Sequence, residues 1–349
     1  MNLFKKAVVL MLLGMIMLSV VGCGGGSSDQ VADSMPEEIN FGILQVPNDE
    51  TIAIQKGLFD KYFEEKGIKC NFIVFDSGAE ANAALASDSI DFATMGNINS
   101  ITARSRELGV ELIWIHEVLG EIEALAVKNG SGINKVEDLS GRKIAVPFAS
   151  TCHFVLLNLL QDAGIKDEVQ LLDMKTTEIV AAWKRGDIEA AYTWQPSLGQ
   201  LLESGEVLVS SQDMIERGYI TANVEVVKKD FAEKYPEQVT SFIACLTEAA
   251  DIYRENPEKA ASIVSERLAV TKEEALMQMQ GSTWYTPEEL LGENLFGTSE
   301  NPGGFTEVMK NTSDFLKKQQ FIDYSPTQEE YNQYVNPAYI ESYIEEYKD

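Results

Sequence analysis

Residues 138–198 read DLSGRKIAVPFASTCHFVLLNLLQDAGIKDEVQLLDMKTTEIVAAWKRGDIEAAYTWQPSL, and this stretch decides the fold class of the chain. Its apolar run at 144–146 predicts a buried strand, and the periodic apolar positions of 154–160 predict a helix that follows. Ser150 or Thr151 stands where the N-cap of that helix belongs. A strand that runs into a capped helix presents free backbone N–H groups at the positive end of the helix dipole. The junction therefore suits an anion, although both residues could equally cap their own helix and do nothing more.

An earlier part of the chain repeats the order of elements found in this stretch. In each copy a helix ends at a Gly-Ile-Lys sequence, at 67–69 and at 164–166, and a strand, a helix, a turn and a second strand follow. The closing strands lie near 91–96 and 188–192. We therefore predict two α/β lobes built on one plan, with right-handed crossovers between their strands. Chance alignment of ordinary α/β sequence is the alternative explanation.

Two such lobes leave a cleft at the carboxyl ends of their strands, where open α/β sheets bind ligands. The loops expected there span 45–48, 96–100, 149–153 and 193–196. The chain is expected to cross into the second lobe just before residue 124 and to return near residue 223. The candidate ligand-binding residues are Gln45, Gly96, Asn97, Glu123, Ser150, Thr151, His153, Trp194 and Asn223.

Four stretches resemble the corresponding parts of a known family. They are FDSGAEANAALASDSID at 75–91, EIEALAVKN at 121–129, IAVPFASTCHF at 144–154 and the segment 179–198. They are similar to the nitrate/sulfonate/taurine substrate-binding protein family of bacterial ABC importers. The resemblance implies a periplasmic-binding-protein-like fold of type II, with two mixed α/β lobes and a ligand cleft between them. It also implies a monomer without a cofactor that captures a small sulfonate such as taurine and delivers it to a permease and its ATP-binding subunit.

This resemblance gives the candidate residues chemical roles. The sulfonate would bind neutral donors at two facing helix starts, which are Ser150, Thr151 and His153 on the second lobe and Asn97 on the first. Glu123 would bind an ammonium group, and Trp194 would cover that group through a cation–π contact. The alternatives are a hinge salt bridge for Glu123 and core packing for Trp194.

Three departures from the family pattern weaken the choice of ligand. Asn223 stands where the family has an aspartate, and the serine-rich loop of the first lobe reads Gly-Asn-Ile-Asn at 96–99. Cys152 replaces a second threonine. Taurine, an alkanesulfonate, nitrate or an aminophosphonate therefore all stay possible, as does a lipoprotein that presents its ligand to a membrane sensor.

An enzyme is the rival class of protein. The same fold family includes pyrimidine-precursor synthases of thiamine biosynthesis, which use a cysteine-rich iron motif and active-site histidines. This chain has isolated cysteines and two histidines, so it lacks that motif and any metal-type spacing. Cys152 and His153 are adjacent, and adjacent side chains on a helix diverge and do not pair. We therefore expect no catalytic residue and no metal.

The N-terminus predicts a lipoprotein. Lys5 and Lys6 precede an apolar run at 7–21 that is short for a membrane span. Residues 18–23 resemble a bacterial lipobox with cleavage before Cys23, where lipid would be attached. We predict a signal peptide at 1–22, a flexible tether at 23–38 and a protein anchored by lipid on the extracytoplasmic face of the cell membrane. An ordinary secretory signal is the alternative.

Charge and spacing complete the prediction. The chain has 55 acidic and 28 basic residues, which makes nucleic acid a poor partner and says little about the small ligand.

Lobe 1 is expected to combine 39–119 with 224–349, including the C-terminal helices, and lobe 2 to span 120–223. Pro236, Pro257 and Thr271 mark the starts of three of those helices.

Overall fold

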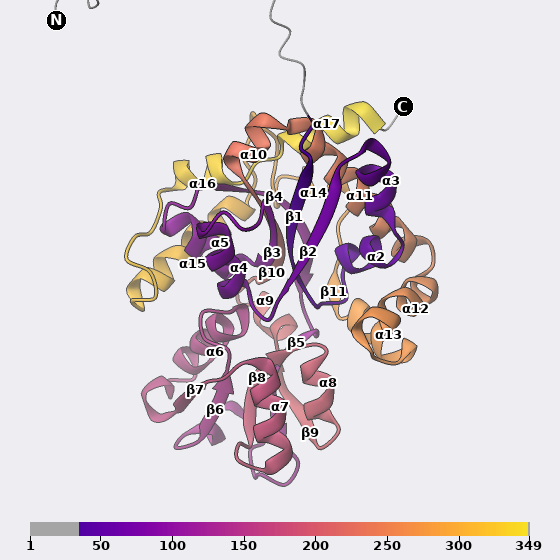
Figure 1. The fold of residues 1–349 in the computed structure, drawn as a ribbon. Coiled ribbons are helices and arrows are strands. Elements are labelled where there is room, and N and C mark those ends of the chain that lie inside the picture. The colour runs from indigo at the N-terminus through magenta and orange to yellow at the C-terminus, as the bar shows by residue number, and fades with distance from the viewer. Residues whose placement is uncertain (1–34, 348–349) are drawn as a thin grey trace, which may run out of the picture. The chain divides into compact units, whose positions relative to one another are not determined.

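Two β-sheets organise the residues that our computed structural model describes, 35–347 (Figure 1). The six-stranded sheet has the order β11-β4-β10-β3-β1-β2, and the five-stranded sheet has the order β7-β6-β8-β5-β9. We call the first sheet, with the helices that pack on it, lobe 1, and the second sheet with its helices lobe 2. The predicted signal peptide, Cys23 and most of the predicted tether lie outside the described residues.

The strands of lobe 1 are β1 (Glu38–Leu44), β2 (Lys69–Phe75), β3 (Phe92–Gly96), β4 (Val110–Leu119), β10 (Ala222–Lys228) and β11 (Ser282–Thr283). Those of lobe 2 are β5 (Glu123–Lys128), β6 (Lys143–Val146), β7 (Gln170–Asp173), β8 (Ala190–Trp194) and β9 (Gly205–Ser210). β1 begins one residue inside the range predicted for the tether.

The two sheets share one pattern of pairing. In lobe 1, β1 pairs parallel with β2 and β3, and β10 runs antiparallel between β3 and β4. In lobe 2, β6 pairs parallel with β7 and β8, and β5 runs antiparallel between β8 and β9. Each sheet is thus a parallel set extended by an antiparallel strand, as the internal repeat of the sequence indicates. The chain changes sheet between β4 and β5 and returns between β9 and β10, while the predicted lobe boundaries remain predictions.

Helices cover both sheets. Those of lobe 2 are α6 (Thr151–Asp162), α7 (Thr176–Arg185), α8 (Ser197–Leu202) and α9 (Ser211–Ile215). Those of the first part of lobe 1 are α2 (Asp49–Gln55), α3 (Leu58–Tyr62), α4 (Gly78–Ala86) and α5 (Asn97–Ser105). None of the helices within 35–347 has both the length and the apolar character that a membrane span needs.

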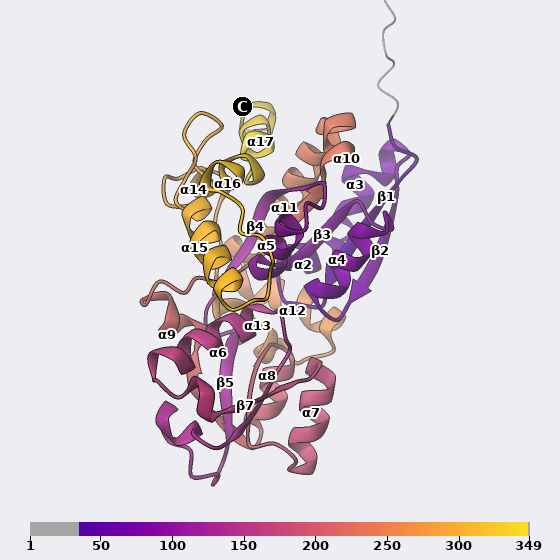
Figure 2. The same ribbon diagram turned by 90° about the vertical axis from the view of Figure 1, so that its left-hand side faces the viewer.

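The C-terminal third returns to lobe 1. It forms α10 (Lys229–Lys234), α11 (Pro236–Glu255), α12 (Pro257–Leu268), α13 (Lys272–Gln280), α14 (Pro287–Leu290), α15 (Phe305–Lys318), α16 (Gln328–Tyr334) and α17 (Ala338–Tyr347). The predicted helix starts are confirmed, because Pro236 and Pro257 occupy first-turn positions and Thr271 caps α13. Figure 2 shows α15 and α16 beside α5 and β4, so segments distant in sequence close this side of lobe 1.

A network of buried charged groups fixes α2 against the sheet of lobe 1. The imidazole of His116 on β4 lies between two carboxylates, with Nδ1 2.6 Å from Asp49 of α2 and Nε2 3.0 Å from Glu225 of β10. The hydroxyl of Thr94 on β3 lies within hydrogen-bond distance of both Glu225, at 2.9 Å, and Glu50 of α2, at 2.6 Å. All five side chains are almost completely buried, so each depends on these partners for its polar interactions.

Burial changes the proton affinity of this network. Burial raises the pKa of Glu50 to about 8, with the Glu225 charge acting in the same direction. Burial likewise raises the pKa of Glu117, the neighbour of His116, to about 8. Burial alone would lower the pKa of His116, but the Asp49 and Glu225 carboxylates raise it well above its usual value. The folded protein therefore holds protons here that an unfolded chain would release.

We predict that the protein is less stable at pH 8 than near pH 5.5. Glu50 and Glu117 keep their protons in the folded state up to about pH 8, whereas carboxyls with the ordinary pKa of 4.5 have lost theirs. Stability falls with pH wherever the folded state binds more protons than the unfolded state, so the loss is on the order of a few kcal/mol. Urea unfolding at the two pH values measures it, and Glu50→Gln should reduce the difference. A free energy of unfolding that stays constant or rises toward pH 8 would contradict this account.

Candidate functional site

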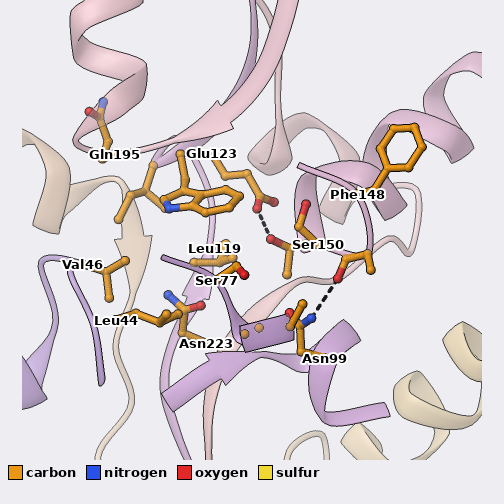
Figure 3. A pocket seen from close by; sticks show the side chains of 17 residues that line it. Leu44, Val46, Ser77, Asn99, Leu119, Glu123, Phe148, Ser150, Gln195 and Asn223 are labelled. Atoms are coloured by element: carbon orange, nitrogen blue, oxygen red, sulfur yellow. Dashed lines mark hydrogen bonds between the residues drawn. The ribbon is translucent and has the colours of Figure 1, made fainter. Parts of the chain in front are cut away.

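A cavity with about 540 Å³ of space not filled by atoms lies between the two sheets (Figure 3). It opens at the carboxyl ends of β1, β3, β4 and β8, where the plan of two facing α/β lobes predicts a ligand site. Its lining residues are Leu44, Val46, Ser77, Gly78, Ala79, Gly96, Asn99, Leu119, Ile122, Glu123, Phe148, Ala149, Ser150, Thr151, Trp194, Gln195 and Asn223.

Three helices begin at this cavity. The N-cap residues of α4, α5 and α6 are Ser77, Gly96 and Ser150, and all three line it. Ser77 caps only the N–H of Glu80, and Ser150 caps only that of His153. The first N–H groups of a helix have no acceptor within it, so those of α4 and α6 are available to a ligand. Among the described residues, no lysine, arginine or histidine lines the cavity, which leaves neutral donors and helix dipoles as its means of holding an anion.

The two lobes touch at the edge of the cavity. A Cβ atom on Gly96 of lobe 1 would come within 2.8 Å of the Thr151 methyl group on lobe 2. The amide of Asn99 on α5 donates to the backbone oxygen of Ala149 in lobe 2 over 2.8 Å. Packing around Asn99 is equally close within lobe 1, because a Cβ on Gly78 would lie 2.7 Å from the Asn99 side chain. Glycine at 96 thus permits the short distance between the lobes, and glycine at 78 leaves room for the Asn99 side chain that bonds across it.

Within residues 35–347, Glu123 is the only charged residue that lines the cavity. It is the first residue of β5 and faces Trp194 on the paired strand β8. Its Oε1 accepts hydrogen bonds from Ser211, at 2.5 Å, and Thr221, at 3.1 Å, and its Oε2 accepts one from Thr151. Burial raises the pKa of Glu123, and these hydroxyl groups oppose the change because they stabilise the carboxylate.

A second buried carboxyl, that of Glu117, does not line the cavity but contacts Asn223, which does. Asn223 of β10 lines the cavity, and its Nδ2 donates to Oε1 of Glu117 on the paired strand β4 over 2.6 Å. Glu117 is fully buried, and its Oε2 has no hydrogen-bond partner among the described residues. Figure 3 shows Asn223 and Leu44 on one side of the cavity and Glu123 and Gln195 on the other. Acidic groups therefore approach the cavity from both lobes.

The structure brings six of the nine predicted site residues to the cavity: Gly96, Glu123, Ser150, Thr151, Trp194 and Asn223. Gln45 is not among the lining residues, because its side chain is exposed while its neighbours Leu44 and Val46 face inward. Asn97 is buried and used locally, since its amide bonds to the backbone of Ile220 and Ala222 where the chain returns to lobe 1. The predicted ligand roles of Gln45 and Asn97 stay predictions.

His153 also lies away from the cavity. Its ring stacks on Phe148 with the centroids 4.3 Å apart, and its Nδ1 accepts the backbone N–H of Ala149. It lines a separate pocket, with about 420 Å³ of space not filled by atoms, together with Arg106 and Phe321. Burial lowers the pKa of His153 to about 4, so the ring is neutral at physiological pH. His153 thus lines the neighbouring pocket, and its predicted role as a donor to an anion beside Thr151 stays a prediction.

Ser77 and Asn99 line the cavity but were not among the candidate ligand-binding residues, although Asn99 lies in the loop 96–100 that was expected at the cleft. Ser77 follows β2 after one residue, Asp76, and precedes a helix of small residues, a pattern that marks an N-cap and could have identified it. Its hydroxyl accepts the N–H of Glu80, and its own hydrogen has no acceptor among the described residues. Ser77 therefore adds a free donor to the cavity.

The sequence of this chain is similar to those of known proteins. Residues 51–260 match the NMT1/THI5 like family. A taurine-binding periplasmic protein of Escherichia coli (strain K12) is 34% identical over 287 residues, which are 80% of this chain and 86% of that protein. A putative aliphatic sulfonates-binding protein of Bacillus subtilis (strain 168) is 28% identical over 267 residues, 75% of this chain and 78% of that protein.

Solved structures share the fold. The periplasmic aliphatic sulphonate binding protein SsuA from Escherichia coli superposes with a TM-score of 0.70 at 20% identity, covering 85% of this chain and 92% of that chain. The desulfurization enzyme DSZB superposes with a TM-score of 0.63 at 16% identity, covering 88% of this chain and 99% of that chain. The predicted two-lobed binding-protein fold is confirmed, and enzymes share it. The chain belongs to the NMT1/THI5-like family and is a substrate-binding protein of the sulfonate and taurine ABC importer family.

We predict that Gly96→Ala holds the lobes apart. The backbone of Gly96 has a φ of −65°, which alanine adopts freely, so the fold should be kept. The added methyl would lie 2.8 Å from a Thr151 side chain that Glu123 holds in place, so the lobes must separate to relieve the clash. Small-angle scattering should give a larger radius of gyration than for the wild type. Gly109→Ala is the matched control, because its Cβ meets nothing within 4 Å, and equal values for all three proteins would contradict the prediction.

Proposed function

We propose that this protein captures a small sulfonate, and taurine in particular, outside the cytoplasm and delivers it to an ABC permease driven by an ATP-binding subunit. The observation that supports this most is the meeting of three helix N-termini at a cavity without cationic side chains. Three sulfonate oxygens require several donors, and neutral N–H and O–H groups provide them without a permanent positive charge.

The sulfonate end of the ligand lies, in this proposal, at the starts of α4 and α6. The Ser77 hydroxyl and the first backbone N–H groups of both helices are its donors. Thr151 contributes its backbone N–H, because its hydroxyl hydrogen is already directed to Glu123. This differs from the role expected from sequence, in which the Thr151 hydroxyl itself bonds the sulfonate.

The ammonium end of taurine lies near Glu123 and Trp194. The Glu123 carboxylate is the one charged group on the cavity wall, and the opposing indole provides an aromatic face. Leu44, Val46 and Leu119 form the apolar wall that the two methylene groups of taurine would contact. The similarity to a taurine-binding periplasmic protein supports this choice of ligand.

An alkanesulfonate is the second candidate ligand, and the relatives named for aliphatic sulfonates favour it. Such a ligand would leave Glu123 without a positive partner, which is why we prefer taurine. We further propose that the protein is a carrier and not an enzyme, although the fold also occurs in DSZB. Burial and the Glu123 carboxylate raise the pKa of the Cys152 thiol well above its usual value, so that this cysteine is a poor nucleophile.

Titration calorimetry of the full-length protein in detergent, with taurine and with ethanesulfonate, tests this proposal. Both ligands should bind one to one, and taurine more tightly. Ser77→Ala removes a donor to the shared sulfonate, so it should weaken both ligands. Glu123→Gln removes the charge that only taurine uses, so it should weaken taurine by about 10- to 150-fold, the worth of a hydrogen bond to a charged group.

Two outcomes would count against the proposal. If the wild type binds neither compound, the assignment to sulfonates fails. If Glu123→Gln weakens both ligands equally, Glu123 acts only through its bonds to Thr151, Ser211 and Thr221, and the ammonium site has no support.

Lipid attachment at Cys23 would place this carrier on the outer face of the cell membrane, close to its permease. Cys23→Ser removes the sulfur that would form the thioether, so the variant should be released from the membrane fraction. Metabolic labelling with a fatty-acid analogue, followed by fractionation, measures this. A variant that still incorporates the label would show that Cys23 is not the site of attachment.

A further inference from the structure

We propose that Glu117 determines specificity by setting which atom of the Asn223 amide faces the ligand. When Glu117 is ionised, it accepts the amide N–H and leaves Oδ1 to accept an N–H from a ligand ammonium. When Glu117 is neutral, its own O–H can donate to Oδ1, and the amide turns its NH₂ toward the ligand. This inference rests on the proposed function, because it concerns the ammonium end of that ligand.

The geometry of the pair supports this role. Asn223 and Glu117 are directly opposite residues on β10 and β4, and their side chains are joined by a 2.6 Å bond from Nδ2 to Oε1. This bond fixes the orientation of the amide when Glu117 is ionised, because a turned amide would then place two oxygens together; a proton on Glu117 removes that restriction. Asn223 lines the cavity and Glu117 does not, so Glu117 is a positioning residue.

The hydrogen bonding of the Glu117–Asn223 pair leaves one oxygen of Glu117 without a partner among the described residues. Oε2 is buried without a partner, and an ionised carboxylate in that condition is costly. Burial raises the pKa of Glu117 to about 8, so the group is mostly neutral near pH 7 when the cavity is empty. The other ionisable groups that act on it are His116, on its own strand, which favours ionisation, and Asp49 of α2, which opposes it.

A bound ammonium changes this balance. A positive charge against Asn223 Oδ1 favours the ionised form of Glu117, both directly and through the amide. Binding of an ammonium-bearing sulfonate should therefore release the Glu117 proton to the solvent, and a sulfonate without the ammonium should not. Glu123, which also lines the cavity, already has three hydroxyl donors for its carboxylate and so gains less from a new partner.

Calorimetry in two buffers of different ionisation enthalpy counts the released protons. At pH 7, the full-length protein should release close to one proton with taurine and almost none with ethanesulfonate, as a pKa of about 8 in the empty cavity requires. The ratio of the two affinities should also shift toward taurine between about pH 6 and pH 8. A purely structural role for Glu117 would move neither quantity.

Glu117→Gln removes the titrating group while keeping its size. It should abolish the proton release and weaken taurine about 10-fold, with less than about threefold change for ethanesulfonate. Glu50→Gln is the matched control, because Glu50 is another buried carboxyl of lobe 1 with a pKa raised to about 8 but has no bond to Asn223. That variant should release the proton as the wild type does.

The outcomes separate the two proposals. If the wild type releases equal numbers of protons with both ligands, the role of Glu117 is overturned while the sulfonate assignment stands, and this test needs no variant that could fail to fold. Proton release that persists in Glu117→Gln also overturns it. If neither ligand binds, the proposed function fails and this inference fails with it.

Discussion

The carboxylate of Glu123 joins the parts of the molecule that must keep a fixed relation around the cavity. It lies at the start of β5, and its oxygens accept hydrogen bonds from the start of α6, the start of α9 and the residue that precedes β10. Both segments that connect the lobes therefore meet at one buried group. A buried carboxylate needs its hydrogen-bond donors, so loss of any one of these contacts would destabilise the folded protein. The same contacts place α6 so that its N-terminus faces those of α4 and α5.

The second constraint is electrostatic. The chain has a formal charge of −27, yet its cavity suits an anion. Helix N-termini resolve this conflict, because they act at short range and add no side chain that must be desolvated. The buried carboxyls of lobe 1 are consistent with a cavity that suits an anion. Glu50 and Glu117, with pKa values near 8, avoid adding negative charge near the cavity while they remain protonated.

Much of the fold could be predicted from the sequence because its signals are local. The apolar run before Ser150, the repeated Gly-Ile-Lys and the prolines at 236 and 257 each depend on neighbours within one turn or strand. The positions of individual side chains depend on geometry that spacing alone does not give. Thr151 and His153 are two residues apart on one helix, about 200° around its axis, so only Thr151 faces the cavity.

The buried charges were harder to predict. The strand β4 reads VELIWIHEVL, in which Glu and His resemble the polar face of a half-exposed strand, but all ten residues are buried. They are covered by α2 and by the C-terminal helices, and that covering depends on contacts between residues more than 50 positions apart. Gln45 shows the opposite difference between sequence and structure, because it was expected at the cavity and is exposed. A residue in a loop at the cleft can point outward while both of its neighbours point inward.

A structure of the taurine complex would test most directly the claim that neutral donors of both lobes hold an anion between them. The account predicts the sulfonate oxygens within hydrogen-bond distance of the first N–H groups of α4 and α6, with the ammonium between Glu123 and Asn223. A sulfonate bound instead to a cationic side chain, such as Arg106 in the neighbouring cavity, would contradict it.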